Sequence, residues 1–353
     1  MTFQHLLLFS LCTTLFLTSC NSDDDSLPEE IVQGEFQNGI LVSHEGSSIS
    51  GSVSFISENL TEVQNDIYRS VNGEDLGVFQ QSMNFLDSLA FVIVDNFNTV
   101  AVVNRYTFKE KVLVTDQLKT PRYIDFLNGK AYITNWGDTA LETDDYVAVL
   151  NLQTFEVEET IPVGNGPERI VVQDELLYIS HKGGFTTNDI LSVIDTRTNE
   201  VTEITVGDNP DELEFDTSGN LWILCEGIND FQNPGNSTAG SLVKFNTTTG
   251  LIDKTFPFTD QQRPSLLVYE NSDLFYYLDG AIFKMDEDSD TLPESPILEE
   301  LNFYGMNIKD NILYGVDAKD FASNGQLDLI NLESLEIQQS FEVGVAPSKI
   351  YFQ

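Results

Sequence analysis

The stretch from Pro167 to Gly227 contains one sequence unit and the beginning of a second copy of it. The unit opens with the apolar run that follows Pro167 and continues through LLYIS, ILSVID and VTEITVG. The opening pattern then returns at Pro210 as PDELEF. Each segment shows the apolar pattern of a short β-strand, and turn-forming residues separate the segments. Four short strands that repeat about every 45 residues are the signature of a β-propeller blade.

The second strand of this unit can be found seven times along the chain. The copies are GILVSH at Gly39, LAFVIVD at Leu89, KAYITN at Lys130, LLYISH at Leu176, NLWILC at Asn220, DLFYYL at Asp273 and NILYGVD at Asn311. Seven copies predict an all-β fold, a seven-bladed β-propeller with four antiparallel strands in each blade.

The innermost strand of the unit carries a proline at its start, where the missing N–H costs no ladder hydrogen bond. Such segments begin at Pro121, Pro167, Pro210, Pro264 and Pro347. The last one, PSKIYFQ, ends the chain, whereas the first unit starts at Gly39 without an innermost strand. We therefore expect the C-terminal strand to complete the first blade and close the ring. An open solenoid, the alternative, does not need such a split repeat.

The N-terminus predicts a lipoprotein. Residues 6–17 are nearly all apolar or small and too few to span a bilayer, and LTSC follows, which resembles a bacterial lipobox. We expect a signal peptide over 1–19, an acidic flexible tether over 20–34 after a lipidated Cys20, and the propeller over 35–353. Residues 1–4 lack the usual Lys or Arg, and a secretory peptide with an incidental cysteine is the alternative.

The acidic residues directly after Cys20 resemble the surface-export signal of Bacteroidetes lipoproteins. They predict an outer-membrane lipoprotein exposed at the cell surface, with an anchor facing the periplasm as the alternative. The membrane is then reached only through the lipid. Of the three cysteines, Cys12 leaves with the signal peptide and Cys20 is lipidated, so Cys225 has no disulfide partner within the chain.

The formal net charge of −40 argues against nucleic acid and anionic lipid as partners, because both require a basic surface. Such a charge serves solubility, or it attracts cations or a basic partner. No Ser/His/Asp set and no Gly-rich phosphate loop is evident in the sequence. We predict no catalytic residues, no catalytic cofactor and no enzymatic activity, although a lactonase or lyase on this scaffold stays open as an alternative.

Long loops follow the second strands, and short Asn, Gly and Thr turns lie at the opposite face. Binding residues concentrate on long loops of a rigid scaffold, so the face with the long loops is the predicted functional surface. Four of these loops carry an aromatic residue: Trp136, Phe185, Phe231 and Phe321. Together they predict a site for a flat ligand held by stacking and by hydrogen bonds to amides. The alternative is that each ring packs on the base of its own loop.

Six further residues complete the predicted ligand site on this face. Four of them end second strands, namely Asn135, His181, Cys225 and Asp317, and two follow a blade-opening proline, namely Arg122 and Arg169. We expect the arginines to rim the channel, or else only to neutralise the acidic residues beside them. A metal site is not predicted, because second strands of different blades lie too far apart to share one ion.

The segments AYITNWGD, VGNGPERI, LLYISHKGG, SVIDTRTNEV and VGDNPDELEFDTSGNLWILCEG resemble the YVTN-repeat or YncE-like propellers. More narrowly, they resemble the BtuG-type surface lipoproteins of Bacteroidetes that capture vitamin B12. The resemblance implies that the ligand is cobalamin or a related corrinoid, which the propeller passes to a TonB-dependent outer-membrane transporter. A propeller that mediates protein or glycan interactions at the cell surface is the alternative.

Overall fold

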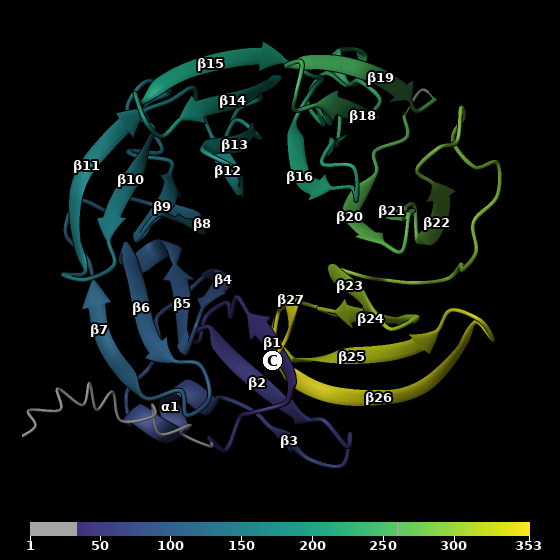
Figure 1. Ribbon diagram of the computed structural model, residues 1–353. Coiled ribbons are helices and arrows are strands. Elements are labelled where there is room, and N and C mark those ends of the chain that lie inside the picture. The colour runs from purple at the N-terminus through teal and green to yellow at the C-terminus, as the bar shows by residue number, and fades with distance from the viewer. Residues whose placement is uncertain (1–33, 260) are drawn as a thin grey trace, which may run out of the picture. The chain divides into compact units, whose positions relative to one another are not determined.

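The computed structural model describes residues 34–259 and 261–353. The predicted signal peptide, Cys20 and all of the predicted tether except Gly34 lie outside these residues. Within the described ranges the strands form seven separate sheets around a central axis, as Figure 1 shows. The predicted seven-bladed all-β propeller is therefore confirmed. No helix in this part of the chain has the length and apolar character needed to cross a membrane.

Within each of the first three blades, the strands follow one another from the axis outward. The first contains β27 (Pro347–Phe352), β1 (Gly39–His44), β2 (Ser52–Ser57) and β3 (Val63–Gln64). The second contains β4 (Gln80–Leu86), β5 (Leu89–Val94), β6 (Thr99–Asn104) and β7 (Glu110–Val114). The third contains β8 (Pro121–Leu127), β9 (Lys130–Asn135), β10 (Tyr146–Asn151) and β11 (Glu156–Pro162). The short helix α1 (Ile67–Asn72) joins the first blade to the second, and the 3-10 turn η1 (Asp95–Phe97) follows β5.

The remaining four blades follow in chain order. The fourth contains β12 (Pro167–Gln173), β13 (Leu176–His181), β14 (Ile190–Asp195) and β15 (Glu200–Thr205). The fifth contains β16 (Pro210–Phe215), β17 (Leu221–Cys225), β18 (Ser241–Asn246) and β19 (Leu251–Pro257), with the 3-10 turn η2 (Pro234–Asn236) after β17. The sixth contains β20 (Ser265–Glu270), β21 (Asp273–Leu278) and β22 (Ala281–Asp286). The seventh contains β23 (Gly305–Lys309), β24 (Ile312–Asp317), β25 (Asn324–Asn331) and β26 (Glu336–Val345).

The C-terminal strand closes the ring as predicted. Strand β27 pairs antiparallel with β1, with Tyr351 opposite Leu41 and Ile350 opposite Val42. Figure 1 shows the yellow end of the chain beside its purple beginning. The pairing covers the inner edge of the first blade, which would otherwise present free backbone groups.

The prediction of four strands in every blade is wrong for the sixth blade, which has three. In place of a fourth strand, a single bridge joins Ile282 to Leu298. The intervening segment contains Pro293 and Pro296 among many acidic residues. Proline donates no ladder hydrogen bond, and closely spaced carboxylates repel one another along an extended edge, so this segment cannot pair continuously.

The hydrophobic core lies between neighbouring blades. Tyr178 of β13, for example, packs edge-on against Phe245 of the next blade, with ring centres 6.2 Å apart. Trp222 is fully buried and stacks against Phe256 in a cluster that extends to Tyr276 of the sixth blade. Side chains alternate across a strand, so both faces of each inner sheet contribute to this packing.

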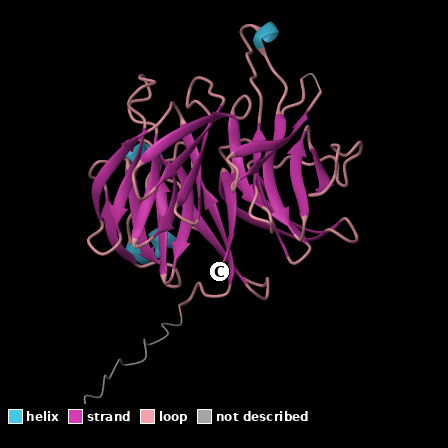
Figure 2. Ribbon diagram, turned by 45° about the horizontal axis from the view of Figure 1, so that its top comes forward, coloured by secondary structure: helices cyan, strands magenta, loops and turns pink. Residues whose placement is uncertain are grey.

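The loops that follow the second strands are long in most blades, and Figure 2 shows such loops extending from one end of the strands. The longest, residues 226–240, connects β17 to β18. The second and sixth blades are the exceptions, because only residues 95–98 separate β5 from β6 and only Asp279 and Gly280 separate β21 from β22. The face with the long loops is called the loop face below.

Candidate functional site

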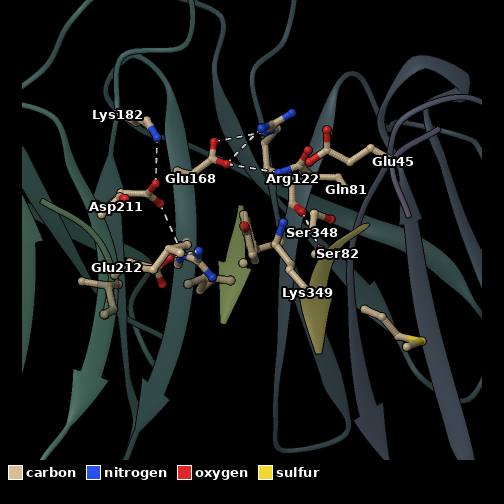
Figure 3. A pocket seen from close by; sticks show the side chains of 18 of the residues that line it. Glu45, Gln81, Ser82, Arg122, Glu168, Lys182, Asp211, Glu212, Ser348 and Lys349 are labelled. Carbon is tan, nitrogen blue, oxygen red and sulfur yellow. Dashed lines mark hydrogen bonds and ion pairs between the residues drawn. The ribbon is translucent and has the colours of Figure 1, made fainter. Parts of the chain in front are cut away.

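A cavity of about 860 Å³ occupies the centre of the propeller and opens at the loop face. Every blade contributes its innermost strand to the wall. The lining segments are 81–84, 122–124, 168–171, 211–214, 265–268, 305–307 and 348–351. Figure 3 shows charged side chains from several of these strands pointing toward one another across the wall.

A bulge near the start of an innermost strand determines which side chains enter the cavity, and six of these seven strands have one. The pairing register shifts between Pro121 and Ile124 in β8, and equivalent shifts follow Pro167 in β12 and Pro210 in β16. In a regular strand, one of two successive side chains would point away from the axis. The bulge lets both residues after each proline line the cavity. These pairs are Arg122 with Tyr123, Glu168 with Arg169, and Asp211 with Glu212.

Arg122 forms the first charged cluster of the wall. Its Nε and Nη2 donate to the two carboxylate oxygens of Glu168 over 3.0 and 2.9 Å, and Nη1 donates to Asp95 over 2.6 Å. The guanidinium carbon lies 3.8 Å from the centre of the Trp136 ring. The Trp136 indole N–H in turn donates to the carbonyl of Pro167 over 3.0 Å. The arginine is therefore fixed by ionic contacts at its edge and by an aromatic ring at its face.

Arg169 and Lys182 form a second cluster around Asp211. Arg169 Nε donates to Asp211 over 3.2 Å, and Nη2 donates to Glu212. Lys182 Nζ lies 2.8 Å from Asp211 and 2.9 Å from Glu226. Figure 3 shows Lys182 and Asp211 joined in this way. Both partners of each pair are largely withdrawn from solvent, so these contacts fix the wall more firmly than surface ion pairs would.

Burial shifts the pKa values of several cavity residues. Desolvation raises the pKa of Glu212 to about 7, with Arg169 opposing that rise, and it raises the pKa of Glu214 to about 8. It lowers the pKa of the Lys349 ammonium to about 8. Asp211 is different, because Lys182 and Arg169 overcome the desolvation and hold its pKa below the usual range. The wall thus combines fixed charges with groups that titrate near neutral pH.

Four of the ten predicted ligand-site residues line this cavity, namely Arg122, Trp136, Arg169 and Phe185. The two aromatic rings contact each other edge-on, with centres 5.8 Å apart, and Phe185 is 79% exposed. The structure therefore brings two predicted loop aromatics and both predicted arginines together at one mouth. The arginines also pair with acidic residues beside them, which was the alternative role considered for them.

Three predicted residues, Asn135, His181 and Cys225, are completely buried behind the cavity wall and do not line it. The Asn135 side-chain amide donates to the carbonyl of Ile133 over 2.8 Å, and His181 Nδ1 lies 3.2 Å from the carbonyl of Asn165. Burial lowers the pKa of His181 to about 4 and raises the pKa of the Cys225 thiol to about 12. These residues support the loops rather than face the cavity.

The other three predicted residues lie outside the cavity lining. Phe321 packs edge-on against Tyr304, a lining residue, with ring centres 4.9 Å apart. Asp317 accepts a hydrogen bond from the side chain of Asn302 over 2.8 Å. Phe231 is 86% exposed in the loop of residues 226–240. Phe231 therefore does not pack on the base of its own loop.

Sequence reasoning missed four lining positions, which share one feature with the predicted residue Trp136. Each directly follows the buried end of a second strand, and the set is Glu45, Asp95, Lys182, Glu226 and, among the predicted residues, Trp136. Alternation explains the pattern: when the last strand residue points into a blade interface, the next side chain is free to turn toward the axis. The repeat did indicate these lining positions, because each one directly follows the strand-end residue of its second strand, and it was mostly the strand-end residues that were predicted.

No group of three or more His, Cys, Asp or Glu residues in the described ranges is arranged to hold a metal ion. No curated protein matches the chain. Its fold resembles several solved structures. A quinoprotein alcohol dehydrogenase-like protein from Bacteroides thetaiotaomicron has a TM-score of 0.64 at 15% identity, and the match covers 90% of this chain and 78% of that one.

The periplasmic gluconolactonase of Pseudomonas aeruginosa has a TM-score of 0.63 at 12% identity, with 89% of this chain and 98% of that one covered. Hydrazine synthase from Kuenenia stuttgartiensis has a TM-score of 0.58 at 12% identity, with 82% and 89% covered. At such identities the likeness shows the fold alone. A family model described as "Domain of unknown function (DUF5074)" matches residues 38–315, which is most of the propeller. The chain belongs to the DUF5074 family, as a seven-bladed propeller that resembles those of the YVTN-repeat and lactonase type.

Proposed function

We propose that the chain is a non-enzymatic binding protein that captures cobalamin or a related corrinoid at the mouth of its central cavity. The observation that carries the proposal is the placement of Trp136 and Phe185 beside the Arg122–Glu168 pair in one cavity. A corrinoid is a large, flat macrocycle rimmed with amides. Aromatic rings can pack on its face, while carboxylate and guanidinium groups accept and donate hydrogen bonds at its rim.

In this proposal Cys20 carries the lipid that anchors the protein at the outer surface of the outer membrane. The LTSC segment and the acidic residues after it support this placement. The propeller then passes its ligand to a TonB-dependent outer-membrane transporter. The high exposure of Phe185 suits such a transfer, because a ligand packed on this ring stays accessible from solvent.

Titration calorimetry of the purified propeller with cyanocobalamin tests the proposal. We expect one binding site and a heat signal at micromolar ligand. Tryptophan fluorescence gives a second measurement, because Trp136 lines the cavity whereas Trp222, the other tryptophan, is fully buried between two blades. Cyanocobalamin should quench the wild type more strongly than a Trp136→Phe variant, in which only the buried Trp222 remains to be quenched. The absence of both a heat signal and quenching at high micromolar ligand would reject the proposal.

A protein or glycan interaction at the cell surface remains the second candidate. It is favoured by exposed apolar side chains on loops of the same face: Phe97 is 59%, Leu141 52% and Phe231 86% exposed. Single scattered apolar residues are common on protein surfaces, but a partner would cover these three together. A photo-crosslinker at position 231 that reproducibly joins one defined partner in intact cells, without any response to cyanocobalamin, would favour this candidate.

A further inference from the structure

The wall of the cavity is divided into a charged side and an apolar side. Strands β8, β12 and β16 with the loops of their blades contribute three basic and five acidic residues to the lining: Arg122, Arg169, Lys182, Glu168, Asp211, Glu212, Glu214 and Glu226. The lining segments 265–268 and 303–307, from the sixth and seventh blades, contain no charged side chain. They present Leu266, Leu267, Val268, Phe303 and Met306 instead. Figure 1 places β20 and β23 across the axis from β8 and β12.

The basic residues of the charged side are already engaged. Arg122 contacts Glu168 and Asp95, Arg169 contacts two further carboxylates, and Lys182 bridges another two. These contacts fix each cation in place and leave carboxylates in excess. A ligand group that approaches this side therefore meets a surplus of hydrogen-bond acceptors and negative charge.

Glu214 is the carboxylate of this side that the ion pairs do not reach. Among the described residues, no basic group lies within 4.0 Å of it, and its side chain makes no hydrogen bond with another protein group. Burial, with a further contribution from the negative charge of Glu212, raises the pKa of Glu214 to about 8, and Arg169 opposes this. Glu214 is partly exposed at the cavity wall, so its carboxylate is open to a hydrogen bond from a donor that a ligand supplies.

Lys349 on β27 restricts how a ligand can be oriented. It lines the cavity beside the apolar side, and its Nζ lies 5.5 Å from the Tyr123 ring centre without a carboxylate within 4.0 Å in the described chain. A cation bound near Lys349 would be repelled, whereas one bound near Glu214 would be attracted. The charges of the wall thus direct the donor end of a ligand toward β16.

We propose that the cavity binds an amphipathic ligand whose apolar part packs on Leu266, Phe303 and Met306 and whose polar end is a cationic or amide N–H donor directed at Glu214. The inference rests on the proposed function in one respect, namely that the cavity is a ligand site. It is consistent with a corrinoid, whose amides supply such donors, and it extends to smaller ligands of the same chemistry.

Benzylguanidinium tests this inference, because its guanidinium donates N–H groups and keeps its charge throughout the pH range near neutrality. Calorimetry should detect binding to the wild type and none of sodium phenylacetate, which has a similar apolar part and the opposite charge. Glu214→Gln should weaken benzylguanidinium binding about tenfold, since it removes the charged acceptor but keeps the side-chain shape. The matched control Glu333→Gln changes an exposed carboxylate in the turn between β25 and β26 and should have no effect.

The pH dependence gives a readout that a purely structural role of Glu214 would not produce. Binding of the cation needs the ionised carboxylate, so affinity should rise as the pH passes from 6.5 to 8.5 through the raised pKa of Glu214. Glu212 and Lys349 face the same space and also titrate there, and Arg169 does not. The part of the rise that disappears in Glu214→Gln is the part assigned to this residue.

Cyanocobalamin measured in parallel separates the two proposals. Binding of benzylguanidinium with the expected loss in Glu214→Gln, but no binding of cyanocobalamin, supports the inference and rejects the corrinoid. Binding of cyanocobalamin that Glu214→Gln leaves unchanged, together with equal binding of phenylacetate and benzylguanidinium, overturns the inference and supports the corrinoid. If the folded wild-type propeller binds none of the three compounds (benzylguanidinium, phenylacetate and cyanocobalamin), both proposals are overturned. Thermal melting of each variant confirms that it is folded.

Discussion

The guanidinium carbon of Arg122 lies 3.8 Å from the ring centre of Trp136, so the rim aromatic and the buried charges of the cavity form one connected structure. The same arginine bonds Glu168 through two nitrogens and Asp95 through the third. A ligand that packs on Trp136 therefore contacts a ring that is held in position by the Arg122 guanidinium. This arrangement keeps the mouth of the cavity rigid before any ligand arrives.

Replacement of Arg122 by alanine should destabilise the propeller strongly. The change leaves Glu168 and Asp95 buried without their cation, which typically costs about 3–5 kcal/mol. Urea unfolding of the variant measures the loss. Arg197→Ala is the matched control, since Arg197 pairs with Asp195 in an exposed turn and its removal should be indistinguishable from wild type. Equal stability of both variants would contradict a structural role for the Arg122 cluster.

The stability of the propeller should fall as the pH rises from 6.5 to 8. Burial raises the folded-state pKa of Glu214 to about 8 and that of Glu212 to about 7, so folding favours their protonated forms and loses this advantage as the pH passes those values. Burial also lowers the pKa values of His44 and His181, which affects stability only below pH 6.5. Urea unfolding at several pH values measures the decline. Glu214→Gln should make the decline in unfolding free energy shallower. An unchanged decline in this variant would show that other residues cause it.

Removal of residues 347–353 should open the ring. Without β27 the inner edge of β1 is unpaired, and the hydrogen bond that the Met83 N–H donates to the Tyr351 hydroxyl over 2.9 Å is lost. The exposed edge should cause self-association, which size-exclusion chromatography detects together with a lower melting temperature. The control Tyr351→Phe removes only the hydroxyl and should cost about 1 kcal/mol while the protein stays monomeric. A truncated chain that melts like the wild type and elutes as a monomer would show that closure matters little.

The fold could be predicted from the sequence because the repeat carries redundant signals. Each second strand is a run of apolar residues bounded by turns, and prolines mark the start of most innermost strands. Even the closure followed from the position of Pro347 near the end of the chain. The three-stranded sixth blade was not predicted, because its missing strand depends on weak pairing across a proline-containing acidic segment rather than on a positive signal.

The site was predicted only in part, for two physical reasons. His181 and Cys225 end buried strands, and the side chains that enter the cavity are their successors Lys182 and Glu226. A shift of one residue reverses the direction of a side chain, and sequence spacing alone does not resolve it. The paired arginines were found, but the contact of Arg122 with Asp95 of the neighbouring blade depends on a bulge visible only in three dimensions.

Binding of a corrinoid through the aromatic rim of the cavity mouth can be tested most directly at two phenylalanines. Phe185 and Phe231 provide a matched test, because both are exposed phenylalanines on loops of the same face and only Phe185 lines the cavity. Calorimetry with cyanocobalamin should give about tenfold weaker binding for Phe185→Ala, equivalent to about 1.4 kcal/mol, and wild-type binding for Phe231→Ala. No binding by the wild-type protein, or equal losses in the two variants, would contradict the account.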